Sequence, residues 1–97
     1  MRWLVDYETL TIESGILWTI DLTPLEVEAS DYAEARKLGI EAVERGTYKP
    51  EFDGVLPLDP LQDPPENEIL KEQAILIAKS IMTDPKFKPE IELVTPL

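Results

Sequence analysis

Apolar and polar side chains alternate along the first thirty residues, and this two-residue period constrains the fold more than any other feature of the chain. Trp3, Val5 and Tyr7 share one face of an extended segment, and Ile16–Leu22 repeats the alternation. Gly15 stands between the two runs, where a glycine suits the left-handed position of a short loop. The pattern predicts a β-hairpin that buries one face.

Two interruptions break this alternation. Around residues 8–9 the phase slips, because the next apolar residues, Leu10 and Ile12, stand at even positions, and a bulge or bend is predicted there. Pro24 interrupts the second run, since proline has no amide hydrogen to donate to a sheet ladder. Residues 25–29 resume the alternation, either as the end of one long bent strand or as a separate short one.

The first predicted helix covers residues 31–45. Asp31 is a favourable N-cap, and Glu34 three residues later matches the spacing of a capping box. Gly46 stands where a C-terminal cap belongs. The apolar stripe is thin, and its small residues allow the helix axis to approach a sheet closely. Its members are Tyr32, Ala35, Leu38, Gly39, Ala42 and Val43.

A proline-rich segment over residues 47–65 holds five of the nine prolines of the chain. Proline favours extended backbone and removes donors from a sheet ladder. The segment is therefore predicted to be an extended arm that packs its leucines on the body, with a short edge strand over residues 54–58 as an alternative. These leucines are Leu56, Leu58 and Leu61.

A second helix is predicted to begin at an aspartate cap, Asp63, and to end at Met82 or Thr83, because an Asp-Pro pair follows. Apolar residues wrap more of this helix than one sheet face can cover. The main stripe consists of Leu70, Ala74, Ile77, Ala78 and Ile81, and the surplus on its flanks consists of Ile69, Leu76, Ile75 and Met82. A closing strand over residues 91–94 follows.

Together these elements predict one compact α+β domain over residues 1–97. The order of strands, helix, arm, helix and strand predicts an antiparallel or mixed sheet of three to four strands with both helices packed on one face. With 43% hydrophobic residues, the chain has enough apolar surface for a core without disulfides or a metal.

Acidic residues dominate the charge, since twenty acids against nine bases give a formal net charge of -11. Such a charge repels nucleic-acid phosphates and anionic lipids, so direct binding to either is not expected. The sequence contains no apolar run near the roughly 20 residues that a membrane-spanning helix needs, and Asp6 interrupts any signal-peptide core. We expect a soluble, cytoplasmic protein.

The absence of cysteine and histidine removes thiolate nucleophiles, Ser-His arrangements and the commonest zinc ligands. Glu26 and Glu28 would lie about 7 Å apart on one strand face, but alternating glutamates are more typical of a solvent-facing surface. Asp53, Asp59 and Asp63 offer oxygen ligands for a hard cation, but their spacing fits no EF-hand loop. No catalytic residue, cofactor or metal site is predicted.

The sequence favours a non-catalytic protein–protein interaction module over an enzyme. The apolar surplus on the second helix predicts a protein partner or a symmetric homodimer. The residues predicted to bind a partner are Leu56, Leu58, Leu61, Ile69, Ile75, Leu76 and Met82.

Two alternative functions remain open. The first is an acidic inhibitor that mimics nucleic acid in the basic groove of a nucleic-acid-binding protein, which the net charge of -11 motivates. The second is a small carboxylate-based enzyme, or a subunit that contributes to a larger active site. The acidic surface that mimicry would use comprises Glu26, Glu28, Asp53, Asp59 and Asp63.

Overall fold

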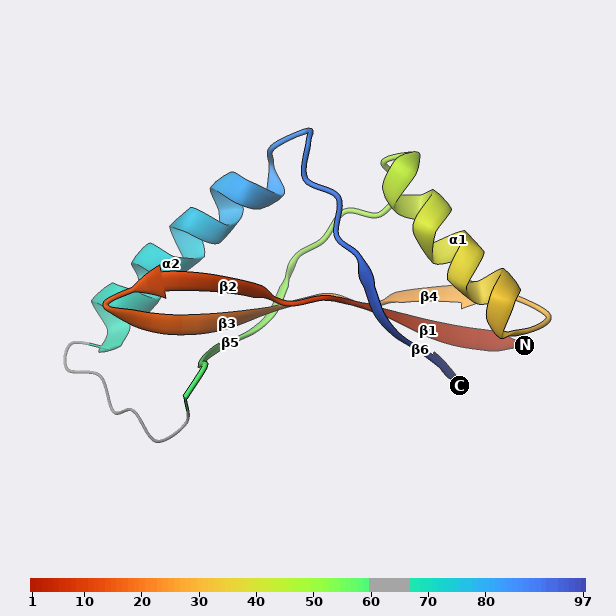
Figure 1. Ribbon diagram of the computed structural model, residues 1–97, viewed down its shortest axis with the longest axis horizontal. Helices are drawn as coiled ribbons and strands as arrows, with labels where there is room; N and C mark the ends of the chain where they lie inside the picture. Colours follow the sequence, from red (N-terminus) through yellow and green to blue (C-terminus); the bar gives the residue numbers. More distant parts are fainter. Residues whose placement is uncertain (60–66) are drawn as a thin grey trace. The chain divides into compact units, whose positions relative to one another are not determined.

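The computed structural model describes residues 1–59 and 67–97 and places six strands and two helices there (Figure 1). In chain order they are β1 (Arg2–Tyr7), β2 (Leu10–Ser14), β3 (Ile16–Leu22), β4 (Leu25–Glu28), α1 (Tyr32–Glu44), β5 (Phe52–Pro57), α2 (Asn67–Met82) and β6 (Ile91–Pro96). The strands form two three-stranded antiparallel sheets, with the orders β4-β1-β6 and β2-β3-β5. The α+β class with antiparallel pairing and two helices confirms the sequence prediction.

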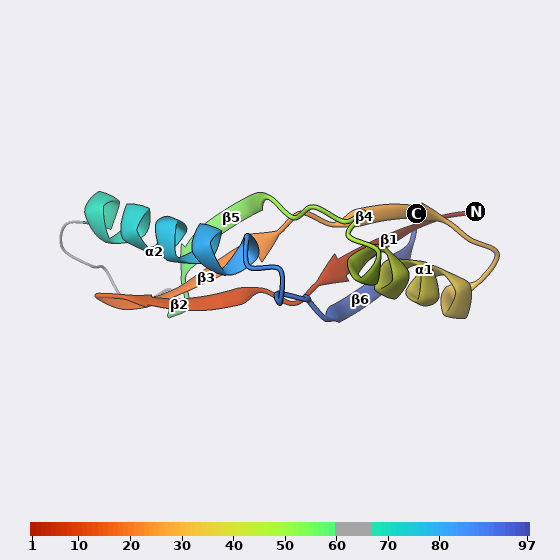
Figure 2. The same cartoon turned by 90° about the horizontal axis from the view of Figure 1, so that it is seen from above.

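The division into two sheets corrects the predicted single sheet of three to four strands with both helices on one face. Each sheet instead carries one helix: α1 packs against β1, β4 and β6, and α2 packs against β2 (Figures 1 and 2). The physical reason is a change of phase, because odd positions are buried in β1 and even positions in β2. One sheet face takes alternate residues of a strand, so this change marks the end of one buried face.

The chain accordingly forms two compact units. Unit 1 comprises Met1–Glu8, Leu22–Glu51 and Lys88–Leu97, and unit 2 comprises Thr9–Asp21 and the described part of Phe52–Phe87. The chain leaves unit 1 at residues 8–9, between β1 and β2, where the alternation slips. The interruption predicted there is confirmed, whereas the single domain stays a prediction.

In unit 1, β1 is the central strand, and Val5 lies opposite Leu25 of β4 on one side and Val94 of β6 on the other. The helix α1 approaches this sheet closely, since a Cβ built on Gly39 would stand 2.8 Å from Val5 Cγ1. The Tyr7 hydroxyl donates a hydrogen bond to the Gly39 carbonyl oxygen at 2.8 Å. The thin stripe of α1 therefore serves the close packing that the sequence predicted.

Both ends of α1 are capped as predicted. The Asp31 side chain accepts a hydrogen bond from the Glu34 amide at 2.8 Å. Gly46 has a φ of 71° and its amide donates to the Val43 carbonyl oxygen, while the next amide donates to the carbonyl oxygen of Ala42. These two bonds form the Schellman arrangement that satisfies the last carbonyl groups of a helix.

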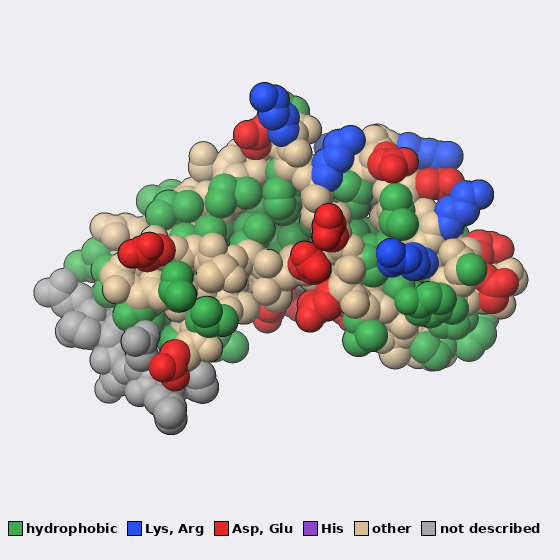
Figure 3. Space-filling model, in the orientation of Figure 1, with side chains coloured by type: hydrophobic (Ala, Val, Ile, Leu, Met, Phe, Trp, Pro, Cys, Tyr) green, Lys and Arg blue, Asp and Glu red, His purple; other side chains and the backbone are tan. Residues whose placement is uncertain are grey.

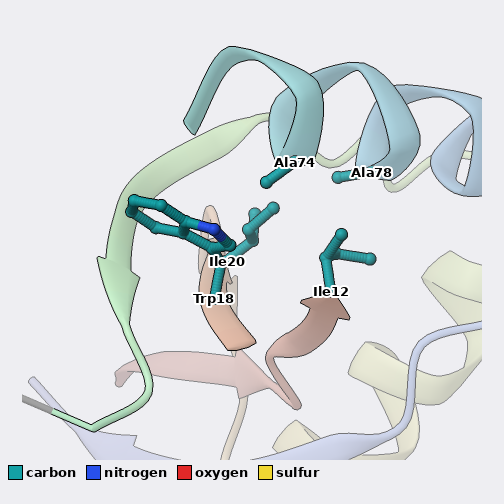
Figure 4. Close-up of a cluster of buried hydrophobic side chains, with 5 residues drawn as sticks. All are labelled: Ile12, Trp18, Ile20, Ala74 and Ala78. Carbon is teal, nitrogen blue, oxygen red and sulfur yellow. The ribbon is translucent and has the colours of Figure 1, made fainter. Parts of the chain in front are cut away.

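In unit 2, α2 lies on its sheet through two small residues, Ala74 and Ala78. Figure 4 shows both side chains directed at Ile12 of β2 and at Trp18 and Ile20 of β3. All five side chains are buried. Because alanine is small, the helix axis comes close to the sheet, and the core of unit 2 is built around this contact.

The β2–β3 turn is attached to the first turns of α2. Gly15 has a φ of 75°, and a Cβ built there would stand 2.7 Å from a methyl group of Leu70. The Ser14 hydroxyl donates to the Leu70 carbonyl oxygen at 2.8 Å, and the Trp18 indole donates to the Ser14 carbonyl oxygen at 2.9 Å. Only glycine meets both the positive φ and the close packing, so its predicted turn position is confirmed.

The strand β5 forms an edge of the second sheet. The Leu58 amide donates to the Leu17 carbonyl oxygen at 2.9 Å, and the Thr23 amide donates to the Glu51 carbonyl oxygen at 3.0 Å, so β5 runs antiparallel to β3. The edge strand allowed over residues 54–58 is thus present with a shift of one to two residues. Residues 60–65 of the predicted arm, with Leu61 and Asp63, lie outside the described residues.

Candidate functional site

The side of α2 that faces away from its sheet carries exposed apolar residues. Ile69 and Leu76 are 58% and 65% exposed, and the exposed Gln73 and Ser80 lie beside them. Gln73 lies at the margin of this side, because its Oε1 accepts a hydrogen bond from the Ser14 hydroxyl of β2 at 3.2 Å. Residues at this spacing of four, three and four lie along one face of a helix. Figure 3 shows hydrophobic side chains gathered over α2, so this helix presents an apolar face to its sheet and another to its surroundings. We call Ile69, Gln73, Leu76 and Ser80 the α2 seam.

The burial along α2 differs in part from the predicted division. Ile77 and Ile81, assigned to the sheet-facing stripe, are exposed, whereas Ile75 and Met82, assigned to an uncovered flank, are half-buried. The reason is that the sheet contact is centred on Ala74 and Ala78, with Leu70 packed beside them. A helical pattern of apolar residues does not specify which stripe makes the contact. The end of α2 at Met82 is confirmed.

A second apolar surface lies on the opposite side of unit 2, on the sheet face away from α2. Val55 of β5 packs against the core cluster, so alternation turns its neighbour Leu56 outward. Leu17 of β3 also lies on this face, and the backbone of Leu58 is bonded to it. The three leucines are 44% to 62% exposed. We call Leu17, Leu56 and Leu58 the leucine patch.

Carboxylates surround the leucine patch. Glu13 lies opposite Leu17 in the β2–β3 ladder, and Glu13 and Asp59 line a shallow hollow of about 520 Å³ together with Leu17 and Leu58. On the other side, Asp21 lies within 3.2 Å of the position that a Cβ on Gly54 would take. None of the described residues that line the hollow is basic.

Four of the seven residues predicted to bind a partner are thus distributed over two surfaces. Leu56 and Leu58 belong to the leucine patch, Ile69 and Leu76 belong to the α2 seam, and Leu61 lies outside the described residues. Leu17 was not predicted as a binding residue, because the alternation over Ile16–Leu22 places it on the same face as Thr19 and Asp21, away from the core. The sequence feature that could have identified it is a single leucine on the strand face that otherwise carries Thr19 and Asp21.

The described residues of the predicted acidic surface are divided between the two units. Glu26 pairs with Arg2 at 2.9 Å and Glu28 pairs with the N-terminal ammonium group at 2.6 Å. Both lie in unit 1, whereas Asp53 and Asp59 lie in unit 2 and Asp63 lies outside the described residues. Nucleic-acid mimicry stays a prediction.

The electrostatics of Glu28 do not favour acid catalysis. The hydrogen bond from the N-terminal ammonium group, and then its charge, lower the pKa of the Glu28 carboxyl. A carboxylic acid that donates a proton near neutral pH needs the opposite shift. Glu26 and Glu28 are also exposed rather than set in a cavity.

The buried titratable groups of unit 1 belong to its core. Tyr7 and Tyr48 stack with their ring centroids 4.1 Å apart. Burial, and then the neighbouring Tyr48, raise the pKa of Tyr7 to about 12, and burial also raises the pKa of Tyr48. The Tyr48 hydroxyl donates to the Thr23 carbonyl oxygen at 2.6 Å. Both hydroxyl groups donate to backbone carbonyl oxygens, so both side chains have structural partners.

Metal-binding and membrane-spanning features were sought in the described ranges, 1–59 and 67–97. No three acidic side chains converge there as ligands for a metal ion. Neither helix in these ranges has the length and apolar character needed to cross a membrane. Comparisons of the chain with protein-family models, with curated proteins and with solved structures find no match.

Proposed function

We propose that the protein is a non-catalytic protein-binding module and that the leucine patch of unit 2 contacts its partner. The observation that supports this proposal is the exposure of Leu17, Leu56 and Leu58 together on one sheet face. Single exposed leucines are common on protein surfaces, but several that adjoin one another mark a contact surface more often.

The rim of the patch defines the chemistry of the partner. Glu13, Asp21 and Asp59 place negative charge around the apolar centre. A partner that inserts leucine- or isoleucine-like side chains and carries lysine or arginine beside them would match both features. Opposite charges at the rim of an interface increase the association rate and exclude partners of the wrong charge.

The proposal is tested by selecting peptides from a random 12-residue display library on the immobilised full chain. We expect enriched sequences that combine aliphatic residues with lysine or arginine. The Leu56→Ser variant should bind these peptides at least about tenfold more weakly, because loss of a buried leucine contact costs about 1.5–3 kcal/mol. Leu93→Ser is a matched control, since Leu93 is an equally exposed leucine (57%) in unit 1.

Two results would contradict the proposal. One is a selection in which no sequence family is enriched. The other is a set of enriched peptides that bind Leu56→Ser as well as the parent protein, or that lose affinity equally for Leu93→Ser. In either case the leucine patch would not be a contact surface.

A further inference from the structure

We infer that α2 pairs with the α2 helix of a second copy of the chain, in antiparallel orientation, through the α2 seam. This surface lies on the side of α2 away from its sheet, whereas the leucine patch lies on the far face of that sheet. The inference is therefore independent of the proposed binding of a partner protein.

The first argument is the spacing of the seam. Ile69, Gln73, Leu76 and Ser80 follow one another at intervals of four, three and four, the repeat by which two helices pack along each other. Ile69 and Leu76 occupy one of the two inward positions, and Gln73 and Ser80 occupy the other. All four are neutral, so a paired seam would bury no charge.

The second argument is charge complementarity, which fixes the orientation. Glu72 and Lys79 are exposed and border the seam on one side, while Leu70 and Ile77 border it on the other. In a parallel pair these charges would face the apolar border of the second copy. In an antiparallel pair the charged border of one helix faces the charged border of the other. Glu72 then lies opposite Lys79 of the second copy, and the two-fold symmetry produces this ion pair twice.

The same orientation sets the register of the seam. Ile69 then lies opposite Ser80 of the second copy, and Gln73 lies opposite Leu76. Each large residue faces a smaller or more flexible one, which lets the two helices interdigitate. On the apolar border, Ile77 faces Leu70 of the second copy.

The pairing is expected to be weak. A helix of 16 residues is about 24 Å long. One pair of such helices therefore buries less surface than a stable protein interface, which buries at least about 1,200 Å². We expect a dissociation constant on the order of 100 µM. Sedimentation equilibrium of the full chain should show monomer at low concentration and mainly dimer near about 500 µM.

Leu76→Glu tests the seam, because it places a charge at the centre of the pair. Leu76 is 65% exposed in the single chain, so the variant should fold, which circular dichroism checks. We expect it to remain monomeric at about 500 µM, while the control Leu93→Glu still forms dimers. A parent chain that is monomeric at this concentration, or a Leu76→Glu variant that still forms dimers, overturns the inference.

A charge exchange tests the orientation. Glu72→Lys and Lys79→Glu should each weaken the dimer about fivefold or more, because each places like charges opposite one another at two symmetric positions. The double variant Glu72→Lys/Lys79→Glu should recover the parental dissociation constant. If the two single effects instead add in the double variant, the antiparallel pair is wrong.

Cysteine cross-linking tests the register, and the chain has no cysteine of its own to interfere. In a mixture, Ile69→Cys should form a disulfide with Ser80→Cys of the second copy under mild oxidation. Ser80→Cys alone should cross-link poorly. Efficient cross-linking of Ser80→Cys to itself would indicate a parallel pair and overturn the inference.

Discussion

Side-chain volume at Gly39 decides how closely α1 packs on its sheet. An added Cβ would lie 2.8 Å from Val5 Cγ1 and 3.1 Å from Ile91 Cδ1, and both neighbours belong to the packed sheet. At an open helical position, replacing glycine with alanine stabilises a protein by about 1 kcal/mol. Whether replacing Gly39 with alanine stabilises or destabilises the protein therefore shows whether α1 lies as close to Val5 as the structure indicates.

We predict that Gly39→Ala lowers the free energy of unfolding by about 1–3 kcal/mol, because the crowded methyl group outweighs the gain in helix propensity. Urea denaturation followed by circular dichroism measures this change. A variant as stable as the parent protein, or more stable, would show that α1 lies further from Val5 than 2.8 Å implies.

The raised pKa of Tyr7 predicts a loss of stability in alkali. The folded state raises the Tyr7 pKa from its ordinary value of 10.0 to about 12, and so favours the neutral phenol. Its contribution to stability is fully present below pH 10 and is lost as the pH rises toward 12, by up to about 2 kcal/mol. Tyr7→Phe has no such group, so its stability should fall less between pH 9 and pH 12. Equal losses in both proteins, measured as urea midpoints, would contradict the assignment.

Among the elements, those defined by local chemistry could be predicted from the sequence. The N-cap at Asp31 and the C-terminal glycine at position 46 give α1 its boundaries to within one residue. The strand alternation and the glycine turn at position 15 follow from equally local rules. Caps, turns and two-residue periods depend on a few neighbouring residues, which a single sequence contains.

We predict that Asp31→Ala destabilises unit 1 by about 1 kcal/mol, since it removes the acceptor for the Glu34 amide. Hydrogen exchange of the α1 amides, compared with those of α2 as an internal reference, would localise the effect. Equal changes in exchange for both helices would mean that the cap does not act on α1 alone.

The contact faces of α2 could not be predicted in the same way. The helix carries apolar residues around most of its circumference, and only the sheet selects Ala74 and Ala78 as the contact. Ile77 and Ile81, predicted to face the sheet, are therefore 42% and 37% exposed. Where several stripes are apolar, the partner surface chooses among them, and that surface is distant in sequence.

For the whole molecule, the pairing of strands that are distant in sequence determines the features that could not be predicted. The change from odd to even buried positions across residues 8–9 indicates that the strands before and after it belong to different sheets. It does not indicate which strand pairs with which. The leucine patch depends on the pairing of β5 with β3, which are separated by about thirty residues. Sequence analysis found Leu56 and Leu58 and missed Leu17, because only this pairing brings the three together.

The most direct test of the proposed function is chemical-shift mapping of the full, ¹⁵N-labelled chain with one basic, aliphatic peptide taken from the display selection. We expect the largest shifts at the amides of Leu17, Leu56 and Leu58 and of the acidic residues beside them, while the amides of unit 1 change little. Shifts centred on unit 1, or spread evenly over both units, would contradict the account.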